Sequence, residues 1–103
     1  MNRVQLRLLL SELQALRYTP AGLSVLDLVL RHQSEVIEAA HPRQLDFELE
    51  ARAIGEVAEA LSRLELGSFI EVEGFLNSTR KDSRRLILHI QRFTVVASNS
   101  IIV

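Results

Sequence analysis

The sequence predicts an all-β protein, a five-stranded barrel with one short helix between strands 3 and 4. Three observations support this fold class. Apolar and polar residues alternate in five short runs, which is typical of strands with one buried face. Between the third and fourth runs, the apolar spacing changes to that of a helix. The chain has 103 residues, 48% of them hydrophobic, so residues 1–103 are predicted to form one domain with one modest core.

The N-terminal half contains the first three predicted strands. The first covers residues 4–10 and continues in a bent form toward Ala15. Proline and glycine in residues 18–22 then favour a turn. The second strand covers residues 26–31 and the third covers residues 45–53, where apolar and charged side chains alternate without interruption.

The C-terminal half contains the helix and two further strands. Residues 56–66 have helical spacing, and Gly67 stands where a helix commonly ends. The apolar stripe of this helix is Val57, Ala58, Leu61 and Leu64. The fourth strand covers residues 70–76 and the fifth covers residues 86–90. Three strands, a helix and two strands is the order of an OB fold, whose helix closes the barrel between strands 3 and 4.

The third strand has two different faces. Phe47 lies on the same side as Leu45 and Leu49 and is therefore predicted to be a core ring. The opposite side carries Asp46, Glu48, Glu50 and Arg52. Three carboxylates there would repel phosphates unless another subunit covers this face.

Charge is separated along the chain although the net charge is only −1. Residues 1–34 have a net charge of +2. Residues 35–73 hold ten acids against three arginines, a net of −7, and residues 77–92 have a net charge of +4. Eleven of the twelve basic residues are arginine, the side chain best shaped for phosphates and flat rings. A local basic segment therefore decides partner binding more than the total charge does.

Several function classes lack support in the composition. The absence of cysteine excludes disulfides, thiolate zinc sites and cysteine nucleophiles, and no phosphate-binding or nucleophile-elbow motif occurs, so neither an enzyme nor a cofactor is predicted. The three histidines, His32, His41 and His89, lack metal-site spacing. No apolar run exceeds three residues, so no membrane association is predicted and a cytoplasmic location is expected.

The strongest candidate site is the polar segment between the last two predicted strands. Arg80, Lys81, Arg84 and Arg85 crowd four positive charges into six positions, with serine and threonine hydroxyls beside them. In an OB barrel this hairpin covers the oligonucleotide-binding face, so the segment predicts a DNA contact. The alternative is an ordinary solvated hairpin.

A weaker candidate is Arg17 with Tyr18 in the first loop. A ring beside a cation is suited to stacking on a base. A core tyrosine or a dimer contact is an equally good interpretation of Tyr18. Apolar Ile101–Val103, together with Leu9 out of phase in the first strand, predicts apolar surface for a second subunit and thus a homodimer.

Several segments, in this order and spacing, resemble bacterial single-stranded DNA-binding proteins, and within that superfamily the family of primosomal replication protein N, commonly called PriB. The segments are residues 2–4, 17–22, 30–34, 38–39, 41–44, 66–76 and 86–89. The family can place aromatic rings at the positions of His41 and Asp46, and neither position carries a large stacking ring in this chain.

The resemblance implies an OB-fold homodimer that binds single-stranded DNA in replication restart and bridges the primosomal helicase and the loader of the replicative helicase. It implies DNA contacts at Arg17, Arg31, Arg43 and the four loop cations. The alternative is an OB-fold protein-interaction module with little or no DNA binding.

Overall fold

The computed structural model describes residues 1–97, so Ile101–Val103 lie outside the described residues. No helix within residues 1–97 is long and apolar enough to span a membrane. In chain order the elements are β1 (Val4–Leu13), β2 (Arg17–Tyr18), β3 (Ser24–Glu38), β4 (His41–Ile54), α1 (Glu56–Ser62), β5 (Phe69–Ser78) and β6 (Leu86–Val96).

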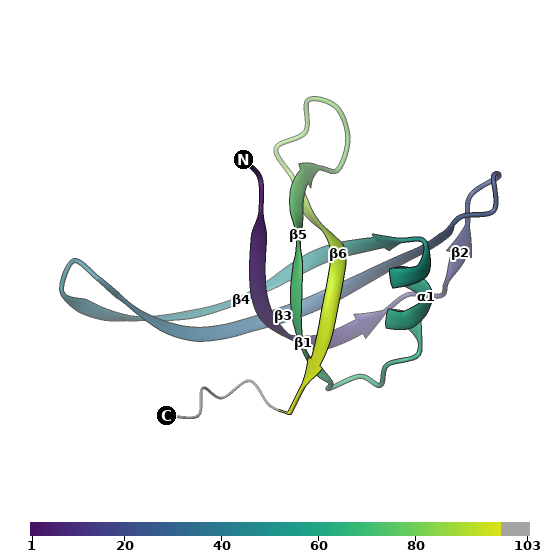
Figure 1. Ribbon diagram of the computed structural model, residues 1–103. Coiled ribbons are helices and arrows are strands. Elements are labelled where there is room, and N and C mark those ends of the chain that lie inside the picture. Colours follow the sequence, from purple (N-terminus) through teal and green to yellow (C-terminus); the bar gives the residue numbers. More distant parts are fainter. Residues whose placement is uncertain (98–103) are drawn as a thin grey trace.

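The strands form one sheet in the order β1-β5-β6-β4-β3-β2, and an additional pairing of β1 with β3 closes it into a barrel. Strand β1 bends between its two partners, with a register shift between Leu10 and Glu12. The all-β class, the five-stranded OB barrel and the single short helix are confirmed. The predicted position of the helix is wrong: α1 lies between β4 and β5, because the two-residue strand β2 precedes the long β3–β4 hairpin (Figure 1).

Alternating apolar residues from five strands fill the barrel, as expected for strands with one buried face. Helix α1 adds the fully buried Ala58 and Leu61 to this core. The helix is shorter than predicted and ends at Ser62, while Leu64 still packs against the core from the following turn. The buried core residues are Leu8, Leu10, Leu26, Leu28, Leu30, Ala51, Ala53, Ala58, Leu61, Ile70, Val72, Leu88 and Ile90.

Strands β3 and β4 form a long antiparallel hairpin that extends well past the barrel as an arm (Figure 1). Fourteen residue pairs hold it, from Val25 opposite Ile54 to Glu38 opposite His41. The two turn residues at the tip, Ala39 and Ala40, have φ of 51° and 67°. Both therefore lie in the left-handed region, which alanine occupies at a cost.

Phe47 lies on this arm and is 40% exposed, so the prediction that it is a core ring is wrong. Alternation places Phe47 on the same face as Leu49, which packs against the core, but one step farther out the barrel has ended. The ring of Phe47 instead contacts the cross-strand partner His32, with ring centroids 5.2 Å apart.

A β-bulge interrupts the pairing of β5 with β6. Glu73 pairs with Arg92 and Gly74 pairs with Ile90, so Gln91 is an extra residue in β6. The insertion reverses the inside–outside alternation of β6, which continues to Val96 rather than ending at Ile90 as predicted. A Cβ atom on Gly74 would lie 1.8 Å from the backbone oxygen of His89, so the close approach requires glycine.

Candidate nucleic-acid interface

An open groove of about 430 Å³ lies on the outward face of β3 and β4. One of its walls is the loop between β5 and β6, and another is the end of β1. In OB folds this face, between the corresponding loops, binds oligonucleotides and oligosaccharides. Its polar lining residues are Glu12, Gln14, Asp27, Glu50, Arg52, Thr79 and Arg85.

Carboxylates neutralise the arginines in and beside the groove. Arg17 Nη2 lies 2.8 Å from Asp27 Oδ2, and Arg52 Nε lies 2.7 Å from Asp27 Oδ1. Partial burial raises the pKa of Asp27, but hydrogen bonds from Arg52 and Arg17 outweigh it and leave that pKa below its usual value. Arg85, at the end of the loop, pairs with Glu50 of β4 across the groove. The groove is therefore a charge-paired surface.

Arg31 and Arg43 lie on the arm and are also paired. Two hydrogen bonds, 2.9 and 2.8 Å long, join the Arg31 guanidinium to the Asp46 carboxylate. They hold the pKa of Asp46 at about 2 and raise that of Arg31. Arg43 lies 3.2 Å from Glu38 near the tip, and alternation places it on the opposite face of the arm from Arg31. The structure thus does not bring these two arginines together.

The remaining loop cations, Arg80, Lys81 and Arg84, are exposed and form no ion pair within residues 1–97. The loop is closed by its own polar contacts, including a 2.9 Å hydrogen bond from the Thr79 amide to the Arg85 carbonyl. Three unpaired positive charges therefore stand at the rim of a groove whose other arginines are paired.

Tyr18 is 63% exposed and follows Arg17 in β2, so the interpretation as a core tyrosine is wrong. A hydroxyphenyl ring in this position is available to a base or to a protein partner. Of the predicted residues, Arg85 lines the groove, Arg17 reaches it through its ion pair with Asp27, and Arg31 and Arg43 lie on the arm beyond it.

Sequence reasoning missed two features of this surface. The first is the set of carboxylate partners, because strand register decides which acid meets which arginine. The second is a stacked pair of rings, Phe75 and His89, with centroids 4.8 Å apart and planes 5° from parallel. Simple alternation could not place them together, because the bulge after Glu73 sets their register.

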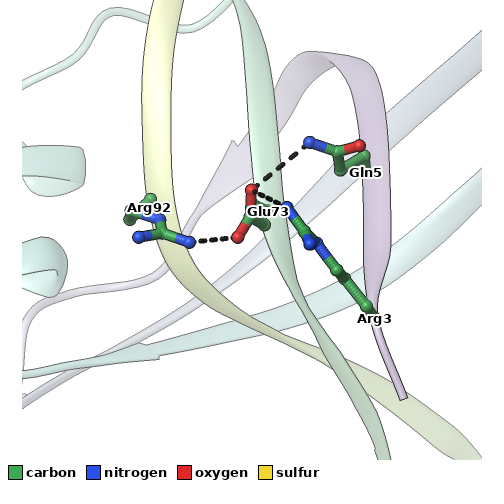
Figure 2. A network of polar contacts seen from close by, with 4 residues as sticks. All are labelled: Arg3, Gln5, Glu73 and Arg92. Atoms are coloured by element: carbon green, nitrogen blue, oxygen red, sulfur yellow. Dashed lines mark hydrogen bonds and ion pairs between the residues drawn. The ribbon is translucent and has the colours of Figure 1, made fainter. Parts of the chain in front are cut away.

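A further charged network lies on the outward face of β1, β5 and β6 (Figure 2). Glu73 accepts hydrogen bonds from Arg92, from Arg3 at 3.2 Å and from Gln5 at 3.3 Å. The hydrogen bond from Arg92 contributes most to lowering the pKa of Glu73; burial opposes it, and Arg3 adds to the lowering. The two arginines are therefore neutralised. Within residues 1–97, no three histidine or acidic side chains gather closely enough to hold a metal ion.

Comparison with known proteins gives concordant matches. The profile of a family described as another single-strand binding protein family matches residues 2–92. The replication restart protein PriB of Bordetella pertussis is 42% identical over 99 residues, covering 96% of this chain and 92% of the relative. The solved PriB structure from Ralstonia solanacearum has a TM-score of 0.82 at 33% identity, covering 92% of this chain and 97% of that one. The single-stranded DNA binding protein from Thermus aquaticus has a TM-score of 0.74 at 30% identity over 93% of this chain and 50% of that one.

Proposed function

The chain belongs to the replication restart protein PriB family of single-strand binding proteins, and we propose that it binds single-stranded DNA as a non-enzymatic accessory protein of replication restart. The observation that carries the proposal is the OB groove beside a loop with three unpaired cations. Relatives named for replication restart and for single-stranded DNA binding share the fold around that groove.

In this proposal, Arg80, Lys81 and Arg84 make the first phosphate contacts because they need no partner exchange. Arg17, Arg31, Arg43 and Arg85 contact phosphates only when each leaves its carboxylate. The exposed ring of Tyr18, next to Arg17 in β2, stacks on a base. DNA binding is then weaker than in a groove without carboxylates. Each arginine that moves to a phosphate loses its ion pair with a carboxylate, and this loss offsets part of the free energy gained from the phosphate contact.

We further propose that residues 1–103 act as one domain in a cytoplasmic homodimer. From Val4 to Leu8, β1 pairs with β5 along one edge, while its pairing with β3 begins only at Leu9. Within residues 1–97 no strand pairs with the other edge of this segment, although the His32 ring contacts the Arg7 carbonyl oxygen at 2.8 Å, and this edge is where a second copy would pair. The half-exposed Phe47 and Val36 on the arm are apolar surface that such a copy would cover.

The family also supports a proposed place between the primosomal helicase on DNA and the loader of the replicative helicase. The second candidate function is an OB-fold protein-interaction module. The specific observation in its favour is the acidic outward face of the arm, where Glu48 and Glu50 flank a groove with paired arginines.

Titration of labelled oligodeoxythymidine at two salt concentrations tests the proposal, with sedimentation of the same samples to give the oligomeric state. Binding that weakens with salt supports DNA binding, because neutralising phosphates releases counterions. No binding at low salt, with helicase or loader binding intact, would establish the interaction module instead.

A further inference from the structure

We propose that the hollow beside the stacked rings of Phe75 and His89 is a base-binding subsite of the single-stranded DNA path. This inference rests on the proposed DNA binding and adds a ring platform that the charged residues do not provide. The hollow has a volume of about 340 Å³, within the size range of small-molecule pockets. Its lining includes Arg52, Ile54, Val57, Phe75 and His89.

Strand register places these rings in line with the groove. Phe75 of β5 is the cross-strand partner of His89 of β6, and His89 is the partner of Arg52 of β4. Arg52 is in turn the partner of Asp27 of β3. One row of side chains therefore runs from the ring pair to the floor of the groove.

Arg52 belongs to both hollows. Its side chain lines the groove and the ring hollow, and its Nε donates a 2.7 Å hydrogen bond to Asp27. A strand of DNA leaving the groove over Arg52 meets the rings next, without crossing another acidic side chain among the residues that line the hollow. The cation and the rings are thus adjacent, which suits a phosphate and its neighbouring base.

The chemistry of the hollow fits a flat, uncharged ring. Phe75 and His89 are both half-buried, and Ile54 beside them is 45% exposed. Burial, and then the charge of Arg52, lowers the pKa of His89, so the imidazole is neutral at neutral pH. A neutral imidazole stacked on a phenyl ring presents an aromatic and apolar surface, on which any base can stack.

The bulge in β6 creates this surface. If Gln91 paired with Gly74 in a regular ladder, His89 would lie opposite Leu76 and face the core, and Ile90 would face outward. Gly74 allows the close approach of the His89 backbone that the bulge requires. The bulge therefore places the two rings side by side on the outer surface of the sheet.

The test compares oligodeoxythymidine with an abasic oligonucleotide of the same length, in the wild type, Phe75→Leu and Phe93→Leu. Phe93 is the matched control, because its ring is also half-buried in the β5–β6 pair but packs against the core. Phe75→Leu is expected to weaken thymidine binding about fivefold or more, as loss of one stacked base does. Its affinity for the abasic strand and its salt dependence should equal those of the wild type, and Phe93→Leu should leave both affinities unchanged. Circular dichroism confirms that each variant folds.

An unchanged thymidine affinity in Phe75→Leu overturns the subsite while leaving the proposed function in place. So does an equal loss on both strands. A wild type that binds neither strand overturns both proposals. A bromodeoxyuridine-substituted strand supplies an independent measurement: photocrosslinks at Phe75 or His89 support the subsite, and crosslinks confined to Tyr18 or Phe47 overturn it. Loss of helicase binding in Phe75→Leu, with unchanged DNA affinity, would assign the hollow to a protein partner and also overturn it.

Discussion

Arg31 of β3 and Asp46 of β4 face each other diagonally across the arm through two hydrogen bonds, from Nε to Oδ1 at 2.9 Å and from Nη2 to Oδ2 at 2.8 Å. A third hydrogen bond reaches Asp46 from Gln33 at 3.2 Å. A two-point contact of this kind fixes the guanidinium in the plane of the carboxylate. The availability of Arg31 to a phosphate therefore depends on the protonation and identity of residue 46.

The first prediction concerns acid stability. The folded pKa of Asp46 is about 2, below the roughly 3.9 of a free aspartate. Between these values the unfolded chain holds the extra proton, so lowering the pH favours unfolding. The stability from Asp46 is therefore present above about pH 4 and is lost as the pH falls toward about 2. Denaturant unfolding at several pH values should show a shallower acid loss in Asp46→Asn than in the wild type, and identical curves would contradict it.

The second prediction concerns the pairing of Glu50 with Arg85. Glu50→Gln releases Arg85 and should tighten oligodeoxythymidine binding about two- to fivefold, the range of one exposed ion pair. Glu48→Gln is the matched control, since it removes the same charge from the same face but Glu48 has no ion pair within the described residues. The control should gain less. An equal gain in both variants would show that total charge, rather than the release of Arg85, controls binding.

The third prediction concerns the unpaired loop cations. Replacing Arg80, Lys81 and Arg84 with alanine should weaken DNA binding and reduce the salt slope by about 0.7 for each lost phosphate contact. The free energy of unfolding should change by less than about 0.5 kcal/mol because all three are exposed. Arg84→Ala and Arg63→Ala form a matched pair, since Arg63 is also exposed and unpaired within residues 1–97. A salt slope unaffected by the triple substitution would place the DNA elsewhere.

The fourth prediction separates Phe47 from a true core residue. Because Phe47 is 40% exposed, Phe47→Ala should lower the free energy of unfolding by about 1–2 kcal/mol, less than the roughly 3–5 of a core phenylalanine. Leu30→Ala, at a fully buried position of the paired strand, should cost about 2–5 kcal/mol. Sedimentation of Phe47→Ala should also show a weaker dimer. A loss as large as that of a core ring, with no change in assembly, would place Phe47 in the monomer core after all.

The alternation of apolar residues predicted most of the inward-facing side chains of the barrel, because a barrel strand must bury one face, but Leu86 at the start of β6 is 51% exposed. Leu26, Leu28 and Leu30 are all buried as expected. The length of the arm could not be predicted, because residues 31–44 pair through backbone N–H and C=O groups. These groups are present whatever the side chains are, so the side-chain pattern does not show where the pairing ends. Phe47 illustrates this. The prediction that it lies on the same face as Leu49 is confirmed, but the prediction that it is buried is wrong.

In the candidate site, too, one part could be predicted from the sequence and another part could not. The loop cations are neighbours in sequence, so their clustering could be predicted from composition. The pairing of Arg85 with Glu50 spans 35 positions and depends on strand register, which side-chain periodicity does not fix. The Phe75–His89 pair depends on one extra residue in β6. The residue in the sequence that marks this bulge is the glycine opposite it, Gly74.

The fifth prediction concerns that glycine. Gly74→Ala should lower the free energy of unfolding by about 1–3 kcal/mol or more, because its Cβ meets a backbone oxygen that no rotamer change can move. Gly67→Ala is a useful comparison: nothing lies within 4 Å, and only its left-handed φ of 89° opposes the change. That cost is about 1–2 kcal/mol. Thermal unfolding that ranks Gly67→Ala as the more damaging would contradict the close approach at Gly74.

The turn of Ala39 and Ala40 has a consequence for the order of folding. Two-residue hairpin turns usually close quickly when asparagine or glycine occupies the left-handed positions, and this tip has neither. The longest ladder of the molecule therefore lacks a favourable starting point at its own turn. Pairing of β3 with β4 should begin where Leu26 and Leu28 collapse with the barrel and should proceed outward, with the tip of the arm ordering last.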